Sequence, residues 1–139
     1  MSTYQSLLVK LKFRRMKIEV SNGEIVDKLA IIEIKLENIT NENKLVNLRA
    51  EYEVLNKAVE SIISKEHPFY TELLNINKKL WVIEDRIREL EKSKDFGNEF
   101  IEVARSVYFT NDLRSEVKRK INELTNSSLI EEKSYEDYS

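Results

Sequence analysis

Apolar residues recur at steps of three and four along most of the chain, which is the spacing of one face of an α-helix. The first such stripe predicts a helix over 23–39. Polar and apolar residues alternate just before it, from Lys17 to Ser21, which favours a short extended segment, and Ser21 or Asn22 can cap the free amides of the first turn. The members of this stripe are Ile25, Leu29, Ile32, Leu36 and Ile39.

A second stripe, from Leu45 to Ile62, predicts a helix that ends near Ser64, because the residue before Pro68 is pushed out of the helical region. The third stripe is the longest and keeps its spacing over three heptads. That regularity favours coiled-coil-like packing, either inside a bundle or between subunits. The members of the third stripe are Phe69, Leu73, Ile76, Leu80, Ile83, Ile87 and Leu90.

The last helical region contains apolar residues from Phe100 to Tyr108 and again from Leu113 to Leu124. Between them, the polar residues 110–112 predict either a kink or the cap of a fifth helix. Short links between long helices favour antiparallel neighbours. The sequence therefore predicts an all-α protein, an antiparallel up-down helical bundle of four to five helices. The bundle spans 16–125, and an acidic, tyrosine-containing tail at 126–139 is irregular or docked in an extended form.

Composition narrows the class of protein further. The chain has two Gly and one Pro in 139 residues, too few for a turn-rich β-sandwich or barrel. It has no Cys, which excludes a disulfide scaffold, a zinc ribbon, an iron–sulfur site and a thiol nucleophile. No apolar run approaches the roughly 20 residues of a membrane span. These features predict a cytoplasmic protein.

Charge is balanced overall but unevenly distributed. The formal net charge is −2, yet residues 1–15 carry four basic and no acidic residues, so that 16–139 sum to −6. The basic extension at 1–15 suits an accessory segment or weak contact with a membrane surface through an amphipathic helix. The negative charge of the remaining chain opposes binding to nucleic acid.

Carboxylates on two predicted helices suggest a metal site. Glu84 and Asp85 follow Trp81 on the third helix, and Glu33 occupies a corresponding stripe on the first. If successive helices alternate in direction, these helices are parallel, and the three carboxylates lie toward the same end of the bundle. Carboxylates that project from separate helices are what a magnesium site in a bundle requires. The alternative is a solvated surface in which Glu84 pairs with Arg88 four residues later.

A second group of residues offers chemistry for anion binding. The region 105–114, with the basic residues at 118–120, combines guanidinium groups, a phenol and the free amides of a helix start. These can bind a phosphate or a carboxylate through two-point arginine contacts and the dipole at a helix N-terminus. The alternative is structural, with residues 112–116 capping a helix and Glu116 pairing with Lys120. The candidate ligand-binding residues are Trp81, Arg88, Arg105, Tyr108, Asn111 and Arg114.

Several segments resemble a family of small uncharacterised helical proteins of bacteria and bacteriophages. The resemblance rests mainly on 16–28, on the Trp81-x-x-Glu84-Asp85 segment and on 104–108, and it covers most of 16–139 while leaving out 1–15. It supplies no activity. It implies that the following residues belong to the family pattern: Gly23, Glu24, Asp27, Lys28, Trp81, Glu84, Asp85, Arg88, Arg105, Tyr108, Asn111 and Asp112.

Two functions fit these observations. The first is a helical-bundle protein without a cofactor that acts through protein contacts and self-associates as a homo-oligomer. The second is a magnesium-assisted enzyme or binding protein for a phosphorylated metabolite, either a nucleotide or a sugar phosphate. In that case arginines hold the anion, and Glu33, Glu84 and Asp85 place the metal. The sequence does not decide whether the protein is an enzyme.

Overall fold

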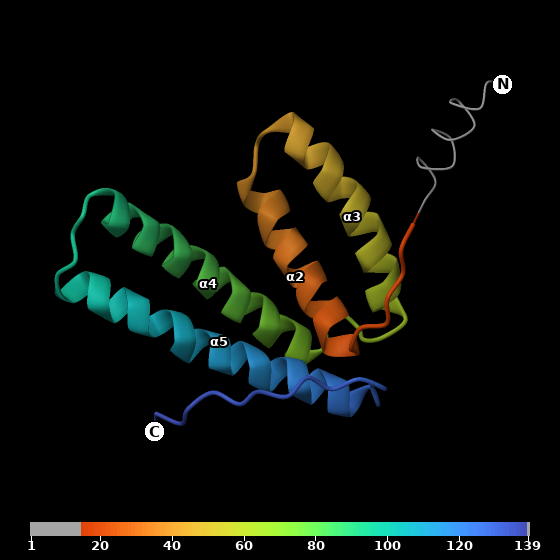
Figure 1. The fold of residues 1–139 in the computed structure, drawn as a ribbon. Coiled ribbons are helices and arrows are strands. Elements are labelled where there is room, and N and C mark those ends of the chain that lie inside the picture. Colours follow the sequence, from red (N-terminus) through yellow and green to blue (C-terminus); the bar gives the residue numbers. More distant parts are fainter. Residues whose placement is uncertain (1–14, 139) are drawn as a thin grey trace, which may run out of the picture.

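The computed structural model describes residues 15–138, and the basic extension lies almost wholly outside them. The described residues form four helices and no strand, which confirms the predicted all-α class (Figure 1). None of these helices is both long enough and apolar enough to cross a bilayer. The helices are α2 (Asn22–Asn38), α3 (Glu42–Glu60), α4 (Pro68–Lys92) and α5 (Asn98–Leu124).

The helices form two antiparallel hairpins, α2–α3 and α4–α5, which meet at one end and diverge toward the other (Figure 1). α2 is the central element, because it packs against α3, α4 and α5, whereas α3 packs against α2 alone among the described helices. Both α2 and α4 begin at the shared end. The predicted up-down order is confirmed within each hairpin, and α2 and α4 diverge away from the shared end (Figure 1).

The hydrophobic core lies where the hairpins meet. Val26 and Leu29 of α2 are fully buried there, together with apolar residues of the other helices. The central position of α2 explains why its burial is broader than the predicted stripe: Ala30 and Ile34 lie outside that stripe and are also buried. The core cluster comprises Val26, Leu29, Val59, Ile63, Tyr70, Leu73, Val117 and Ile121.

The long stripe of α4 is used inside the chain. Leu73, Leu80, Ile83 and Leu90 are all buried, and α4 packs against α5 and α2. The heptad spacing therefore reflects packing within one chain, which is the first of the two alternatives that the sequence left open.

α5 is one continuous helix of 27 residues, so the break expected at 110–112 does not occur. Thr110 is 2% exposed and lies within the helix. Thr, Asn and Asp are only weakly unfavourable in a helix interior, and the packing of a neighbouring helix outweighs such preferences. The four observed helices fall within the predicted four to five.

The start of α2 is held against the end of α5. The backbone N–H of Gly23 donates to Asn122 Oδ1 at 2.6 Å, and the Ser21 side chain caps α2 by accepting from Glu24 N at 3.1 Å, as predicted. A Cβ at position 23 would overlap the carbonyl oxygen of Lys118, so only glycine permits this approach. The two hairpins are thus joined through backbone as well as side-chain contacts.

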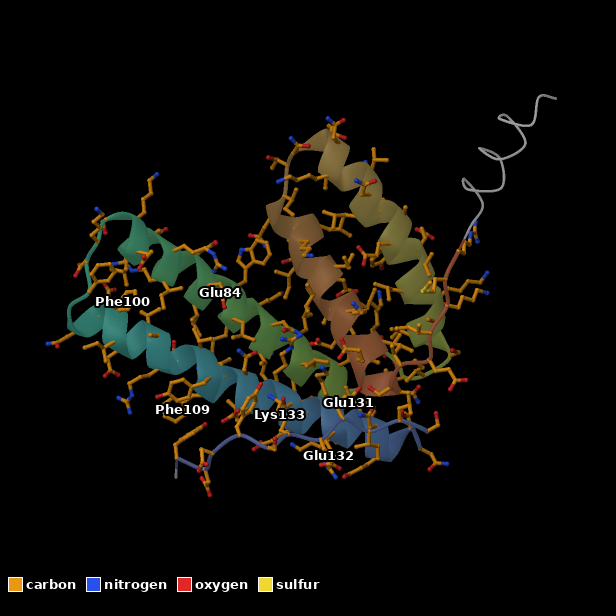
Figure 2. All side chains as sticks on the ribbon, in the orientation of Figure 1. Glu84, Phe100, Phe109, Glu131, Glu132 and Lys133 are labelled. Carbon is orange, nitrogen blue, oxygen red and sulfur yellow. The ribbon has the colours of Figure 1, made fainter. Side chains whose placement is uncertain are left out.

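The C-terminal tail is docked on α5 in an extended form (Figure 1). Glu131 accepts hydrogen bonds from Ser21 and from Asn122, so it joins the beginning of α2 to the end of α5. Glu132 pairs with Arg119 at 3.1 Å, and Figure 2 shows both glutamates where the tail lies alongside the helix. Of the two forms that the sequence left open for the tail, irregular or docked and extended, the structure has the docked one.

Candidate ligand-binding cleft

A cleft of about 460 Å³ opens where the two hairpins diverge. Residues of α2, α4 and α5 line it, and Glu84 lies about midway along α4 (Figure 2). Six of the lining residues belong to the candidate sites that the sequence predicts. The lining consists of Ile31, Asn77, Leu80, Trp81, Glu84, Asp85, Arg88, Asn111 and Arg114.

A buried ion pair forms the inner end of the cleft. The side chain of Asp27 on α2 is 0% exposed, and its Oδ1 accepts a hydrogen bond from Arg114 Nε of α5 at 3.0 Å. Nη2 of Arg114 donates a second hydrogen bond to Asp27 Oδ2, and Asn77 Nδ2 of α4 donates to Oδ1 at 2.8 Å. Three helices therefore converge on one carboxylate. A carboxylate in this position is tolerated only because it is paired and hydrogen-bonded.

Asp27 fixes the position of Arg114 and stabilises its charge. The hydrogen bond to Asp27 raises the pKa of the Arg114 guanidinium above its ordinary value, against the opposing effect of burial. A guanidinium has five N–H donors. Asp27 accepts hydrogen bonds from Nε and one terminal nitrogen of the guanidinium. The Arg114 side chain is 27% exposed where it lines the cleft. Its other terminal nitrogen makes no hydrogen bond within residues 15–138 and is available to a ligand.

Other polar groups of the lining also lack partners. Asn77 is 5% exposed, and no donor among the described residues contacts its carboxamide oxygen. The indole N–H of Trp81, the carboxamide of Asn111 and the carboxylate of Asp85 likewise make no hydrogen bond or ion pair in the described part of the chain. Trp81 and Asn111 are half-buried, and Asp85 is exposed. The cleft therefore combines unused donors and acceptors with one large aromatic side chain.

The rim of the cleft is formed by an exposed ion pair. Arg88 pairs with Glu84 four residues earlier, as the solvated alternative predicts, and also donates to the Glu84 backbone oxygen at 3.0 Å. The Arg88 side chain is 70% exposed. Pairs of this kind contribute about 0.3–0.5 kcal/mol, so a ligand can displace this one at little cost.

Glu33 does not join Glu84 and Asp85. Its carboxylate pairs with Lys65 Nζ at 2.9 Å, and Lys65 also donates to the hydroxyl of Tyr52 at 2.9 Å. Lys65 lies in the link between α3 and α4, and Glu33, paired with it, is not among the residues that line the cleft. Within the described residues, no group of three or more His, Cys, Asp or Glu side chains is arranged to hold a metal ion.

Arg105 and Tyr108 lie outside the cleft as well. Arg105 pairs with Glu102 at 3.2 Å and lies over the ring of Phe109. Tyr108 packs edge-on against Tyr138 of the tail. Phe109 projects from α5 toward the tail (Figure 2), where a second and larger groove of about 1140 Å³ lies. Asn111 contributes to both the cleft and this groove.

The sequence alone does not predict Asp27 and Asn77 as site residues. Asp27 belongs to the family pattern, and Asn77 lies four residues before Trp81 on the same face of α4. One signal pointed to Asp27: a carboxylate directly follows Val26 in a strongly apolar stretch of α2 and requires a buried partner.

The chain was compared with protein families, with curated proteins and with solved structures. No curated protein and no solved structure matches it. The model of a family of unknown function, DUF6165, matches residues 16–138 and leaves the basic extension outside. The match spans the four helices and the docked tail, including every residue of the cleft. The chain therefore belongs to the DUF6165 family of unknown function.

Proposed function

We propose that the protein binds a small phosphorylated metabolite, of the sugar phosphate or nucleotide class, in the cleft between the two hairpins. The observation that carries this proposal is the fixed position of Arg114. A fully buried carboxylate holds one edge of its guanidinium, while its remaining donors belong to the lining of an open cleft.

Arginine suits this role because its planar donors match the oxygens of a phosphate or carboxylate. A guanidinium that is already held in place loses little side-chain entropy when a ligand binds, so more of the interaction energy appears as affinity. Arg88 can add a second cationic contact at the rim, since its present partner Glu84 is only a surface ion pair.

The rest of the cleft provides contacts for the organic part of a ligand. Binding sites of about 300–1,000 Å³ with apolar and aromatic walls and a few placed polar groups are typical of small-molecule pockets. Here Ile31, Leu80 and Trp81 provide apolar surface, and Asn77 and Asn111 provide unpaired carboxamide atoms. Magnesium usually binds through one or two carboxylates together with substrate phosphates, and Glu84 and Asp85 are the carboxylates of this cleft.

A thermal-shift screen tests this proposal. Sugar phosphates and nucleotides are added at millimolar concentration, each with and without magnesium. A ligand present at 100 times its dissociation constant stabilises the folded state by about 2.7 kcal/mol, so at least one compound is expected to raise Tm clearly.

Two matched variants locate the binding. Arg88→Gln removes the cationic contact at the rim of the cleft, whereas Arg86→Gln removes an exposed arginine of α4 that lies outside it. We expect the response to the ligand to weaken in the first variant and to persist in the second. A screen without any stabilising compound, or equal responses of the two variants, would contradict the proposal.

Action through protein contacts with self-association is a second candidate. It is supported by apolar side chains that remain exposed on one side of α5: Phe109 is 40% exposed and Leu113, four residues later, 48%. The groove beside the tail adjoins this face. Light scattering after size-exclusion chromatography tests it: a concentration-dependent dimer that Leu113→Ser abolishes supports it, and a monomer at high micromolar concentration contradicts it.

A further inference from the structure

We propose that the ligand of this cleft is zwitterionic, with an anionic group at Arg114 and an ammonium group between Trp81 and Asp85. The inference rests on the proposed function for the anionic half of the ligand. The ammonium half rests on separate observations of charge, pairing and placement along α4.

The first observation is the charge of the cleft. Its lining holds two carboxylates, Glu84 and Asp85, and two guanidiniums, Arg88 and Arg114, so that its formal charge is zero. Asp27 lies directly against Arg114 and makes the whole arrangement negative by one charge. An unaccompanied phosphate dianion would therefore enter a site that is already slightly negative. A ligand that also brings a positive charge avoids this cost.

The second observation is the pairing of these charges. Arg114 is bound to Asp27, and Arg88 to Glu84. Asp85 is the remaining charged residue of the lining and has no ion pair or hydrogen bond among the described residues. The charge that the cleft leaves unmatched is thus negative and lies on α4.

The third observation is the order of residues along α4. Asn77, Trp81 and Asp85 follow one another at four-residue steps, which places them on one face of the helix. Asn77 is 95% buried, and its carboxamide oxygen is without a donor. This row therefore presents an acceptor oxygen, an indole ring and a carboxylate, and each of these groups favours an ammonium. Arg114 contributes donors from α5 opposite this row, while Arg88, also on α4, is paired with Glu84 at the rim.

Two matched pairs of compounds test the inference. Glucosamine 6-phosphate and glucose 6-phosphate differ by an ammonium in place of a hydroxyl, and phosphoethanolamine and ethyl phosphate differ by the presence of an ammonium. Trp81 is the only tryptophan of the chain, so its fluorescence reports directly on occupation of the cleft. In at least one pair we expect the ammonium compound to bind about tenfold more tightly.

The variant Asp85→Asn keeps the size of the side chain and removes its charge, and Glu91→Gln is the matched control on an exposed, unpaired acid of α4. The preference for the ammonium compound is expected to fall below about threefold in the first and to persist in the second.

Each outcome of the experiment has a distinct meaning. Equal affinity within both pairs, or tighter binding of a screen compound without an ammonium group, overturns the zwitterionic assignment and leaves the proposed function standing. A preference that survives Asp85→Asn also overturns it. If no phosphorylated compound changes the fluorescence or the melting temperature, both proposals fail together.

Discussion

Asp27 of α2 and Arg114 of α5 form a two-point ion pair that joins the two hairpins at the inner end of the cleft. The carboxylate is fully buried, while the guanidinium reaches the cleft surface. The same contact therefore supports the fold and positions the group to which we assign anion binding. Loss of either partner is expected to affect both properties.

Replacement of Arg114 tests the structural role of this pair. Arg114→Met leaves Asp27 buried without a cation, and breaking a buried ion pair in this way costs about 3–5 kcal/mol. The free energy of unfolding in urea measures the loss. Arg119→Met on the same helix is the control. Its two partners, Glu123 of α5 and Glu132 of the tail, are both exposed, so its loss is expected to be much smaller. Equal losses in the two variants would show that the Asp27 pair has no special role.

Gly23 tests the close approach of α2 to α5. A methyl group at this position would overlap the backbone of Lys118 and lie 2.9 Å from Asn122 Oδ1, and backbone cannot move aside cheaply. Gly23→Ala is therefore expected to lower the free energy of unfolding by about 1–3 kcal/mol.

Gly97→Ala is the matched control for that substitution. The new methyl would meet only Asp95 Oδ1, at 3.4 Å, and the backbone at position 97 has a negative φ that alanine adopts readily. Because Gly97 is the N-cap of α5 and alanine is a weaker cap, the free energy of unfolding is expected to fall slightly, by less than about 1 kcal/mol. If the two alanine variants melt alike, the helices do not meet as described.

The stripe of α4 makes a further prediction. Leu73 is fully buried in the core of the single chain, so Leu73→Ala is expected to cost about 2–5 kcal/mol. Val82 lies on the same helix and is 67% exposed, so Val82→Ala should change stability by less than about 0.5 kcal/mol. Both are measured by chemical denaturation at two protein concentrations. A loss at Leu73 that depends on protein concentration would indicate an interface between subunits instead of an internal core.

The carboxylate of Glu131 is expected to make the free energy of unfolding depend on pH. Burial alone would raise the pKa of its carboxyl, but hydrogen bonds from Ser21, a backbone amide and Asn122, with the charge of Lys118, together lower it. A group whose pKa is lower in the folded state stabilises that state above its unfolded pKa, near 4.5, and this contribution is lost as the pH falls through the folded value.

The variant Glu131→Gln should therefore be less stable than the wild type at neutral pH, and the difference should shrink on acidification. Denaturation at a series of pH values from about 7 to about 3 measures it. Glu136→Gln is the control, since Glu136 lies on the same tail and makes no hydrogen bond among the described residues. A difference that stays constant with pH would mean that the Glu131 carboxylate does not join the tail to α2.

The positions of the helices followed closely from the sequence because the apolar spacing directly reflects helical geometry. The predicted first helix at 23–39 is observed as Asn22–Asn38, and Ser21 caps it. The divergence of the hairpins was not predictable in the same way. It depends on which helices share a face, and a stripe shows that a face is buried without showing which helix covers it. The broad burial of α2 is the clearest example.

The candidate site was predicted in part, and the errors have a geometric origin. Arg105 and Arg114 are nine residues apart, which in a continuous helix places them on opposite sides. A break at 110–112, which the sequence predicts, would remove this relationship, and for that reason the sequence places both arginines in one site. The prediction for Glu33 fails for a related reason. Parallel helices bring residues to the same height along the bundle, but this does not decide toward which neighbouring helix each side chain points. Glu33 pairs with Lys65 and does not line the cleft.

Nuclear magnetic resonance of nitrogen-15-labelled protein tests ligand binding in the cleft most directly. The indole N–H of Trp81 and the Nε–H of Arg114 each give a distinct signal. During titration with the most stabilising compound of the thermal-shift screen, both signals are expected to shift and saturate together, while the backbone amides of Tyr135 and Tyr138 beside the second groove stay unchanged. Shifts confined to the tail, with the Trp81 and Arg114 signals unmoved, would contradict the account.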